Sequence, residues 1–150
     1  MKIFINTSKG GRIRTGWYLY VLEFIKEDKS VVSRSNLDRM KPVENTTEAR
    51  LTLMALIEAV SRIKVDEYVD VDINVGNHGI YQAFNNHWYD RWVKREFDDI
   101  KNADLWRAYR EEVNRHPKCA FRLINPDEFN TYSSWMHFTI RQKEERGKCR

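Results

Sequence analysis

The sequence has few of the features that mark membrane, secreted or disulfide-stabilised proteins. No apolar run reaches the ~20 residues of a membrane-spanning helix, so we expect no membrane partner. The first residues, MKIFINTS, lack the pattern of a secretory signal peptide. The two cysteines, Cys119 and Cys149, do not make a disulfide framework. Together these features predict a cytoplasmic location.

Several local signatures of catalysis are also missing. The four histidines are scattered along the chain without the paired spacing of a metal site. Gly10-Gly11 by itself predicts a turn and not a phosphate-binding loop. No Ser-His-Asp or Cys-His arrangement stands out. Short motifs alone therefore identify no enzyme class.

What the chain does contain is typical of one globular domain. Its 150 residues are 41% hydrophobic and 32% charged, with a net charge of +4. The positive charge favours acidic partners such as nucleic acid, although a mildly basic, solvated surface explains it equally well. We expect a single domain over residues 1–142 and a charged, frayed tail at 143–150. The oligomeric state does not follow from the sequence.

Hydrophobic periodicity predicts the order βββ-α-β-ααα-β-α. The predicted strands cover residues 2–5, 16–25, 30–35, 68–75 and 119–124, and the predicted helices cover 46–63, 78–84, 88–97, 104–114 and about 128–142. The fourth strand follows a helix, so we expect it to run parallel to the first strand through a right-handed crossover. The fold class is therefore α/β, with helices on both faces of a mixed sheet.

The first long helix has a predicted start signal. Asn45 fits the N-cap position, and Glu48 follows three residues later, where a capping box places its reciprocal partner. Glu48 therefore has a structural explanation that needs no catalytic role.

Three segments carry a resemblance to a known family. They are Phe4-Ile5-Asn6-Thr7-Ser8 at the end of the first strand, the stretch NTTEARLTLMA at 45–55, and Lys101-Asn102-Ala103-Asp104-Leu105-Trp106 at the start of a helix. With the element order, they make the chain similar to ribonuclease H of the type 1 branch. The resemblance implies a ribonuclease H-like, five-stranded mixed sheet in which strands one to three are antiparallel.

The resemblance also implies that the catalytic carboxylates are replaced. In this family four acidic side chains bind two magnesium ions, and the corresponding positions here are Asn6, Thr52, Gly76 and Ser134. Magnesium requires charged oxygen ligands in near-octahedral geometry. We therefore expect no catalytic residues, no metal and no cofactor. The family's Gly-His loop before the last helix is replaced by residues 125–128, which contain no histidine.

Basic and aromatic residues alternate in the segment that the family uses to grip nucleic acid. The residues that we predict to contact RNA or a hybrid duplex are Trp88, Arg91, Trp92, Lys94 and Arg95. Alternatively, the tryptophans pack on the sheet and the basic side chains are only solvated. Arg12 and Arg14, beside Lys9, form a second basic cluster at a turn, which either binds nucleic acid or only improves solubility.

The sequence thus predicts a non-catalytic, ribonuclease H-like protein that binds nucleic acid or a ribonucleoprotein. Such a protein would suit a phage or mobile element as a regulator or inhibitor. Two alternatives remain. One is a residual magnesium-dependent ribonuclease that cleaves the RNA of RNA–DNA hybrids, in which case magnesium is the cofactor. The other is a protein–protein interaction module that acts without nucleic acid.

Overall fold

The computed structural model describes residues 1–10, 12–65, 67–124 and 130–148. Its strands are β1 (Lys2–Thr7), β2 (Arg14–Gly16), β3 (Tyr18–Ile25), β4 (Val31–Ser35), β5 (Val43–Thr46), β6 (Val69–Val75) and β7 (Cys119–Ile124). Its helices are α1 (Glu48–Ser61), α2 (His78–Asn85), α3 (Trp88–Lys94), α4 (Ala103–Asn114) and α5 (Ser133–Lys148), with a short 3₁₀ turn, η1 (Leu37–Arg39).

The main sheet has five strands in the order β4-β3-β1-β6-β7. β1 pairs antiparallel with β3, which pairs antiparallel with β4, while β1–β6 and β6–β7 are parallel. The predicted five-stranded mixed sheet, with its parallel crossover between β1 and β6, is therefore confirmed.

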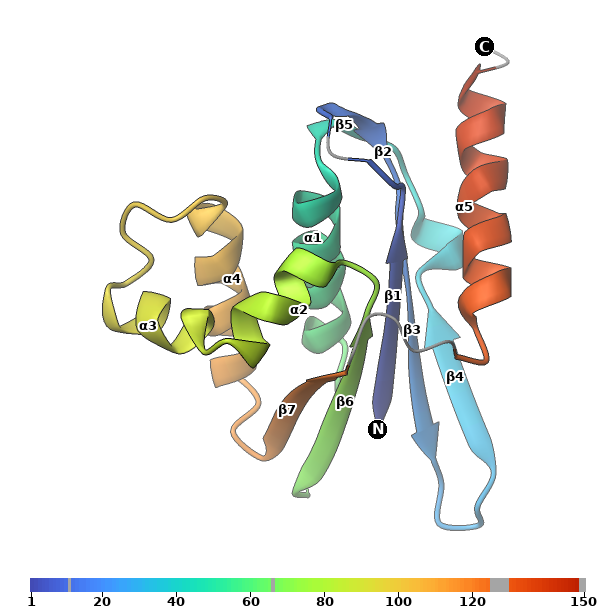
Figure 1. Cartoon of the computed structure of the whole chain (residues 1–150). Helices are drawn as coiled ribbons and strands as arrows, with labels where there is room; N and C mark the ends of the chain where they lie inside the picture. The colour runs from blue at the N-terminus through green and yellow to red at the C-terminus, as the bar shows by residue number, and fades with distance from the viewer. Residues whose placement is uncertain (11, 66, 125–129, 149–150) are drawn as a thin grey trace.

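Helices cover both faces of this sheet, and each face has its own core. Figure 1 shows α1, α2 and α4 on one side and α5 on the other. The larger core lies between α1 and the sheet and contains Ile3, Ile5, Leu53 and Ile73. The smaller one lies under α5, where Met136 and other α5 side chains pack on β1 and β3. Among the described residues, no helix has the length and apolar character to cross a bilayer.

The start of α1 differs from the prediction. The N-cap is Thr47, whose hydroxyl accepts a hydrogen bond from the Arg50 N–H at 3.3 Å. Asn45 instead lies in β5 with a left-handed φ of 50°. Glu48 is the first helical residue, and its side chain reaches away from the helix, so the capping-box interpretation of Asn45 and Glu48 was wrong.

Two further boundaries were wrong for identifiable reasons. The strand predicted at 16–25 is split, because Gly16 belongs to a separate two-stranded sheet with β5. Gly16 approaches α1 so closely that a Cβ there would lie 2.6 Å from Leu51 Cδ1. The last helix begins at Ser133 and continues to Lys148, instead of covering residues 128–142.

Helix α4 is joined to α1 by an ion pair that uses the acidic residue of the Asp-Leu-Trp segment. Arg50 Nη2 lies 2.8 Å from Asp104 Oδ2, and Arg50 Nη1 lies 3.1 Å from Asp104 Oδ1, a two-pronged contact that is stronger than a single bond. The hydrogen bond from Arg50 lowers the pKa of the Asp104 carboxyl. This contact links α1 to the start of α4, the helix that carries the buried Trp106.

Stability at alkaline pH should depend on Tyr20, which is fully buried in the larger core. Burial raises its pKa to about 12, against an opposing hydrogen bond from Arg62. Because the folded-state pKa lies above the unfolded value of about 10, the stabilisation is complete below pH 10 and is lost as the pH rises through 12. Urea unfolding between pH 8 and 12 measures this loss. The free energy of unfolding should fall less steeply with pH in Tyr20→Phe than in the control Tyr68→Phe, which alters an 86% exposed side chain. Equal slopes would contradict this assignment.

Candidate functional site

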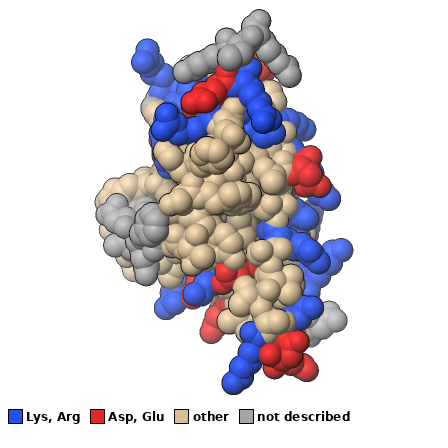
Figure 2. Space-filling model, turned by 90° about the vertical axis from the view of Figure 1, so that its right-hand side faces the viewer, with Lys and Arg blue, Asp and Glu red and all other residues tan. Residues whose placement is uncertain are grey.

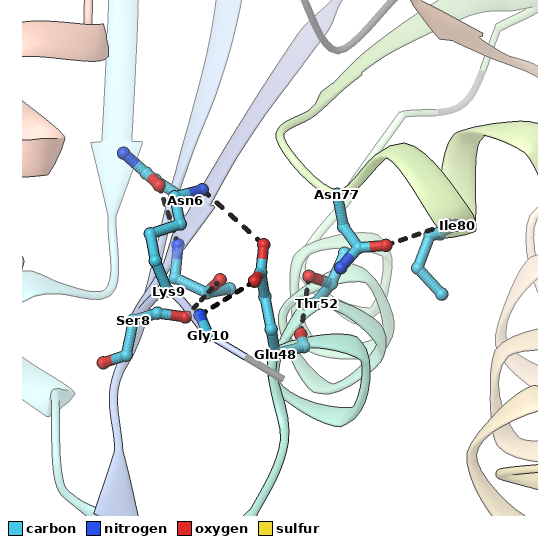
Figure 3. Close-up of polar contacts among 9 residues, drawn as sticks. Asn6, Ser8, Lys9, Gly10, Glu48, Thr52, Asn77 and Ile80 are labelled. Atoms are coloured by element: carbon cyan, nitrogen blue, oxygen red, sulfur yellow. Dashed lines mark hydrogen bonds and ion pairs between the residues drawn. The ribbon is translucent and has the colours of Figure 1, made fainter. Parts of the chain in front are cut away.

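Three of the four positions that the resemblance assigns to metal-binding carboxylates meet at one end of the sheet. Ile5 and Val75 are partners across the parallel β1–β6 pair, so Asn6 and Gly76 follow side by side. A Cβ on Gly76 would lie 3.6 Å from the Ile5 carbonyl oxygen. Thr52 faces this end of the sheet from α1 and is 1% exposed (Figure 3).

A lysine and a glutamate dominate the electrostatics of this site. Lys9 Nζ lies 3.9 Å from Glu48 Oε1, and a Cβ on Gly76 would lie 3.3 Å from the same Nζ. Glu48 Oε2 accepts a hydrogen bond from the Gly10 N–H at 3.1 Å. Gly10 has a φ of +122°, a conformation that favours glycine and folds the loop after β1 over the start of α1. Figure 3 shows Lys9 and Gly10 both meeting the Glu48 carboxylate.

The neutral oxygens of the site are already used within the fold. Asn6 Oδ1 accepts a hydrogen bond from the Thr7 N–H at 2.9 Å, and the Thr52 hydroxyl donates to the Glu48 carbonyl oxygen at 2.9 Å. Asn77 Oδ1 caps α2 by accepting from the Ile80 N–H at 2.9 Å. Each of these contacts holds a backbone element in place.

The fourth position lies on the other face of the sheet. Ser134 is exposed on the first turn of α5. Tyr132, two residues earlier, packs its ring on Phe4 with the centroids 4.9 Å apart. The structure therefore does not bring Ser134 together with the other three positions. The residues at 125–128, which replace the family's Gly-His loop, lie outside the described part of the chain.

Within the described ranges, no group of three or more His, Cys, Asp or Glu side chains is arranged to hold a metal ion. Glu48 is the acidic side chain seen in Figure 3. Asp72, on β6, instead forms an ion pair with Arg122 on β7 at 3.1 Å. Glu48 and Asp72 are paired with different cations, so the geometry does not support a magnesium site built from these two carboxylates.

The predicted basic helix is α3, and its cations face solvent. Arg91, Lys94 and Arg95 are all exposed. Arg91 Nη2 donates to the Asn86 carbonyl oxygen at 3.3 Å and Arg95 Nη2 to the Asp98 carbonyl oxygen at 3.1 Å, so both guanidinium groups are held close to the helix. Arg91 and Lys94 belong to α3 and Arg95 is its C-cap, and we call these three exposed residues the α3 cations.

The two tryptophans of α3 have different environments. Trp88 is 38% exposed, whereas Trp92 is half-buried and its ring centroid lies 5.3 Å from that of Trp106. The rings of Trp88 and Trp92 are 6.5 Å apart. Trp92 thus anchors α3 to the core, and Trp88 is the more exposed ring of the two.

The two arginines of the second basic cluster have different environments in the structure. Arg12 is exposed, but Arg14 is half-buried and lies against Gly10, where an added Cβ would be 2.5 Å from Arg14 Nη1. Arg14 therefore supports the loop that positions Lys9. The sequence prediction grouped Lys9 with this turn and did not place it in the site, because its contact with Glu48 joins residues far apart in the chain.

Comparisons with known proteins agree with this architecture. The chain is 36% identical over 73 residues to a ribonuclease H of Sulfurovum sp., covering 49% of this chain and 48% of that relative. It is 28% identical over 116 residues to a ribonuclease HI of Helicobacter pylori, covering 77% of this chain and 73% of the relative. In fold it is similar to LC9-RNase H1, a type 1 RNase H with the type 2 active-site motif, with a TM-score of 0.69, 18% identity, and coverage of 94% of this chain and 70% of that one.

The chain is ribonuclease H-like in fold and sequence. It is also similar to the foamy viral protease-reverse transcriptase solved in complex with an RNA/DNA hybrid, with a TM-score of 0.62, 10% identity, and coverage of 93% of this chain and 19% of that one. The ribonuclease H-like chain spans about half the length of the first curated relatives it matches. No protein-family model matches it.

Proposed function

We propose that this ribonuclease H-like protein binds RNA or RNA–DNA hybrid duplexes without cleaving them. The observation that carries the proposal is the ammonium of Lys9, which lies against Glu48 and Gly76 where the family resemblance places metal-binding carboxylates. A structural neighbour was solved with an RNA/DNA hybrid, which supports the choice of ligand. The exposed cations of α3 supply the phosphate contacts.

The donor groups support the non-catalytic part of the proposal. Two-metal hydrolysis needs clustered anionic oxygens to hold both dications. Here Asn6 and Thr52 offer an amide and a hydroxyl that are already hydrogen-bonded, Gly76 offers no side chain, and Glu48 is paired with a cation. These donors do not fit two magnesium ions, and no step of the proposed activity passes through a metal.

A protein that covers a hybrid without cutting it blocks other proteins from the same duplex. This is the action of a regulator or inhibitor of a ribonucleoprotein, and we extend the proposal to such a role in a phage or mobile element. The extension rests on the chemistry of non-cleaving binding alone.

Replacing the three α3 cations tests the binding surface. The variant Arg91→Ala/Lys94→Ala/Arg95→Ala should lower the slope of log Kd against log salt by about 2–3, because each lost phosphate contact removes roughly 0.9 from it. Its affinity for a 20-base-pair hybrid should fall about 100-fold at low salt. The matched control is Lys26→Ala/Lys41→Ala/Lys64→Ala, which removes equal charge from exposed positions elsewhere.

Two results would contradict the proposal, one from these binding titrations and one from a cleavage assay. Equal losses in both triple variants would show that net charge and not the α3 surface governs affinity. Incubation of a labelled hybrid with the wild-type protein and magnesium should leave the RNA strand intact. Cleavage that a chelator abolishes would instead establish the residual ribonuclease.

One observation favours the alternative of a protein-interaction module. The outer side of α5 exposes two large aromatic side chains, Trp135 at 39% and Phe138 at 60%. Figure 2 shows the face that carries α5, with uncharged side chains across its centre and basic and acidic side chains around them. Under this alternative the wild-type protein has no affinity for hybrid, RNA or DNA even at low salt.

A further inference from the structure

The most unusual feature of the site is a cation supplied by the protein itself. Lys9 follows β1 by two residues, and the loop through Gly10 turns its side chain toward the start of α1. Its ammonium lies between Glu48 and the backbone at Gly76. The site thus pairs one positive charge with one negative charge, where the family resemblance implies a cluster of four carboxylates.

We propose that Lys9 binds a backbone phosphate of the nucleic acid directly, with no divalent ion between them. This inference rests on the proposed function and names a phosphodiester contact additional to the α3 surface. A cluster of unneutralised carboxylates would repel a phosphate, whereas a site that is neutral overall and presents an ammonium attracts one. Gly76 itself contributes no side-chain atom beside Nζ.

The contacts of Lys9 allow this exchange of partners. Its side chain is 51% exposed, and its separation of 3.9 Å from Glu48 is at the long end for an ion pair. Such a solvent-screened pair stabilises a fold only weakly, so Lys9 can turn to a stronger acceptor. Glu48 keeps its hydrogen bond from the Gly10 N–H, and the carboxylate is therefore not left without a partner.

Substitution of Glu48 should change the affinity for nucleic acid in the opposite direction to substitution of Lys9. Its negative charge opposes an incoming phosphate and competes for Lys9. Glu48→Gln keeps an oxygen that can accept from the Gly10 N–H but removes the charge. A purely structural role for the Lys9–Glu48 pair would make both single substitutions harmful or neutral, whereas the phosphate contact requires Lys9→Ala to weaken binding and Glu48→Gln to strengthen it.

The experiment measures the affinity of the full chain for a 20-base-pair RNA–DNA hybrid across a potassium chloride series containing a chelator. We expect Lys9→Ala to reduce the salt slope by about 0.9 and to raise Kd on the order of fivefold at low salt. Lys9→Arg should retain both values near wild type, and Glu48→Gln should lower Kd. The matched control is Lys26→Ala, an exposed lysine outside the site.

The outcomes separate this inference from the proposed function. If the wild-type protein binds and Lys9→Ala matches Lys26→Ala in Kd and slope, the Lys9 contact is wrong while the proposed function stands. If binding needs magnesium, or if Glu48→Gln weakens it, the metal-independent contact is also overturned. If the wild-type protein does not bind the hybrid at low salt, both proposals fall together.

Discussion

Trp106→Ala is expected to lower the free energy of unfolding by about 3–5 kcal/mol, the usual cost of truncating a large buried aromatic residue. Trp106 is 3% exposed, and four other rings surround it. Centroid distances to them are 5.7 Å for Phe84, 5.7 Å for Tyr89, 5.3 Å for Trp92 and 6.3 Å for Tyr109. The substitution would open a cavity among α2, α3 and α4 that these side chains cannot fill without moving.

The matched control for this prediction is Trp88→Ala. Trp88 lies on α3 and is 38% exposed, so its removal should cost much less stability while still reducing hybrid affinity through lost stacking. Trp106→Ala should reduce affinity for another reason, because Trp92 of α3 loses the ring against which it packs. Urea unfolding and hybrid titration of both variants measure the two effects, and equal losses of stability would contradict the assigned core.

The main elements of the fold could be predicted from the sequence because their patterns are local. Alternating apolar residues define β6, and helical spacing defines α1, whose inward positions include Leu53 and Leu56. The split at Gly16 could not be predicted in this way. It depends on the pairing of Gly16 with Val43 in β5, which lies far along the chain and leaves no local mark in a run of strand-forming residues.

The candidate site was predictable only in part, for the same reason. The family motifs located Asn6, Thr52 and Gly76, and the parallel β1–β6 pair places the first and third side by side. The roles of Lys9 and Glu48 depend on where the loop after β1 folds. Glu48 matched a capping-box pattern, but Thr47 takes the cap and leaves the Glu48 side chain to meet Lys9 and Gly10.

Restoring carboxylates should create magnesium-dependent stability, and this gain should be much larger when Lys9 is removed as well. Asn6→Asp, Thr52→Glu and Gly76→Asp return acidic side chains to three positions of the family pattern. Position 76 accepts a Cβ, since its nearest contact would be the flexible end of Lys9 at 3.3 Å. The carboxylate that Gly76→Asp introduces would therefore pair with the Lys9 ammonium, which would compete with a dication for the same oxygens.

The triple variant should consequently bind magnesium weakly, and adding Lys9→Ala should tighten binding by at least about tenfold. A unit charge 4 Å away contributes about 4 kcal/mol at an effective dielectric constant of 20, well above the 1.4 kcal/mol that a tenfold change needs. At a magnesium concentration 100 times Kd, linkage adds about 2.7 kcal/mol to the free energy of unfolding. Thermal unfolding with magnesium or a chelator measures this gain.

The control for this reconstruction must carry the same change of charge away from the site. Asn86→Asp, Thr131→Asp and Gln142→Glu with Lys26→Ala alter exposed side chains only and should show no magnesium-dependent gain. Equal magnesium affinity with and without Lys9 would mean that its ammonium does not compete with a dication. Magnesium-dependent stability in the wild-type protein would show that Asn6, Thr52 and Glu48 already suffice, and would remove the electrostatic basis for a non-cleaving role.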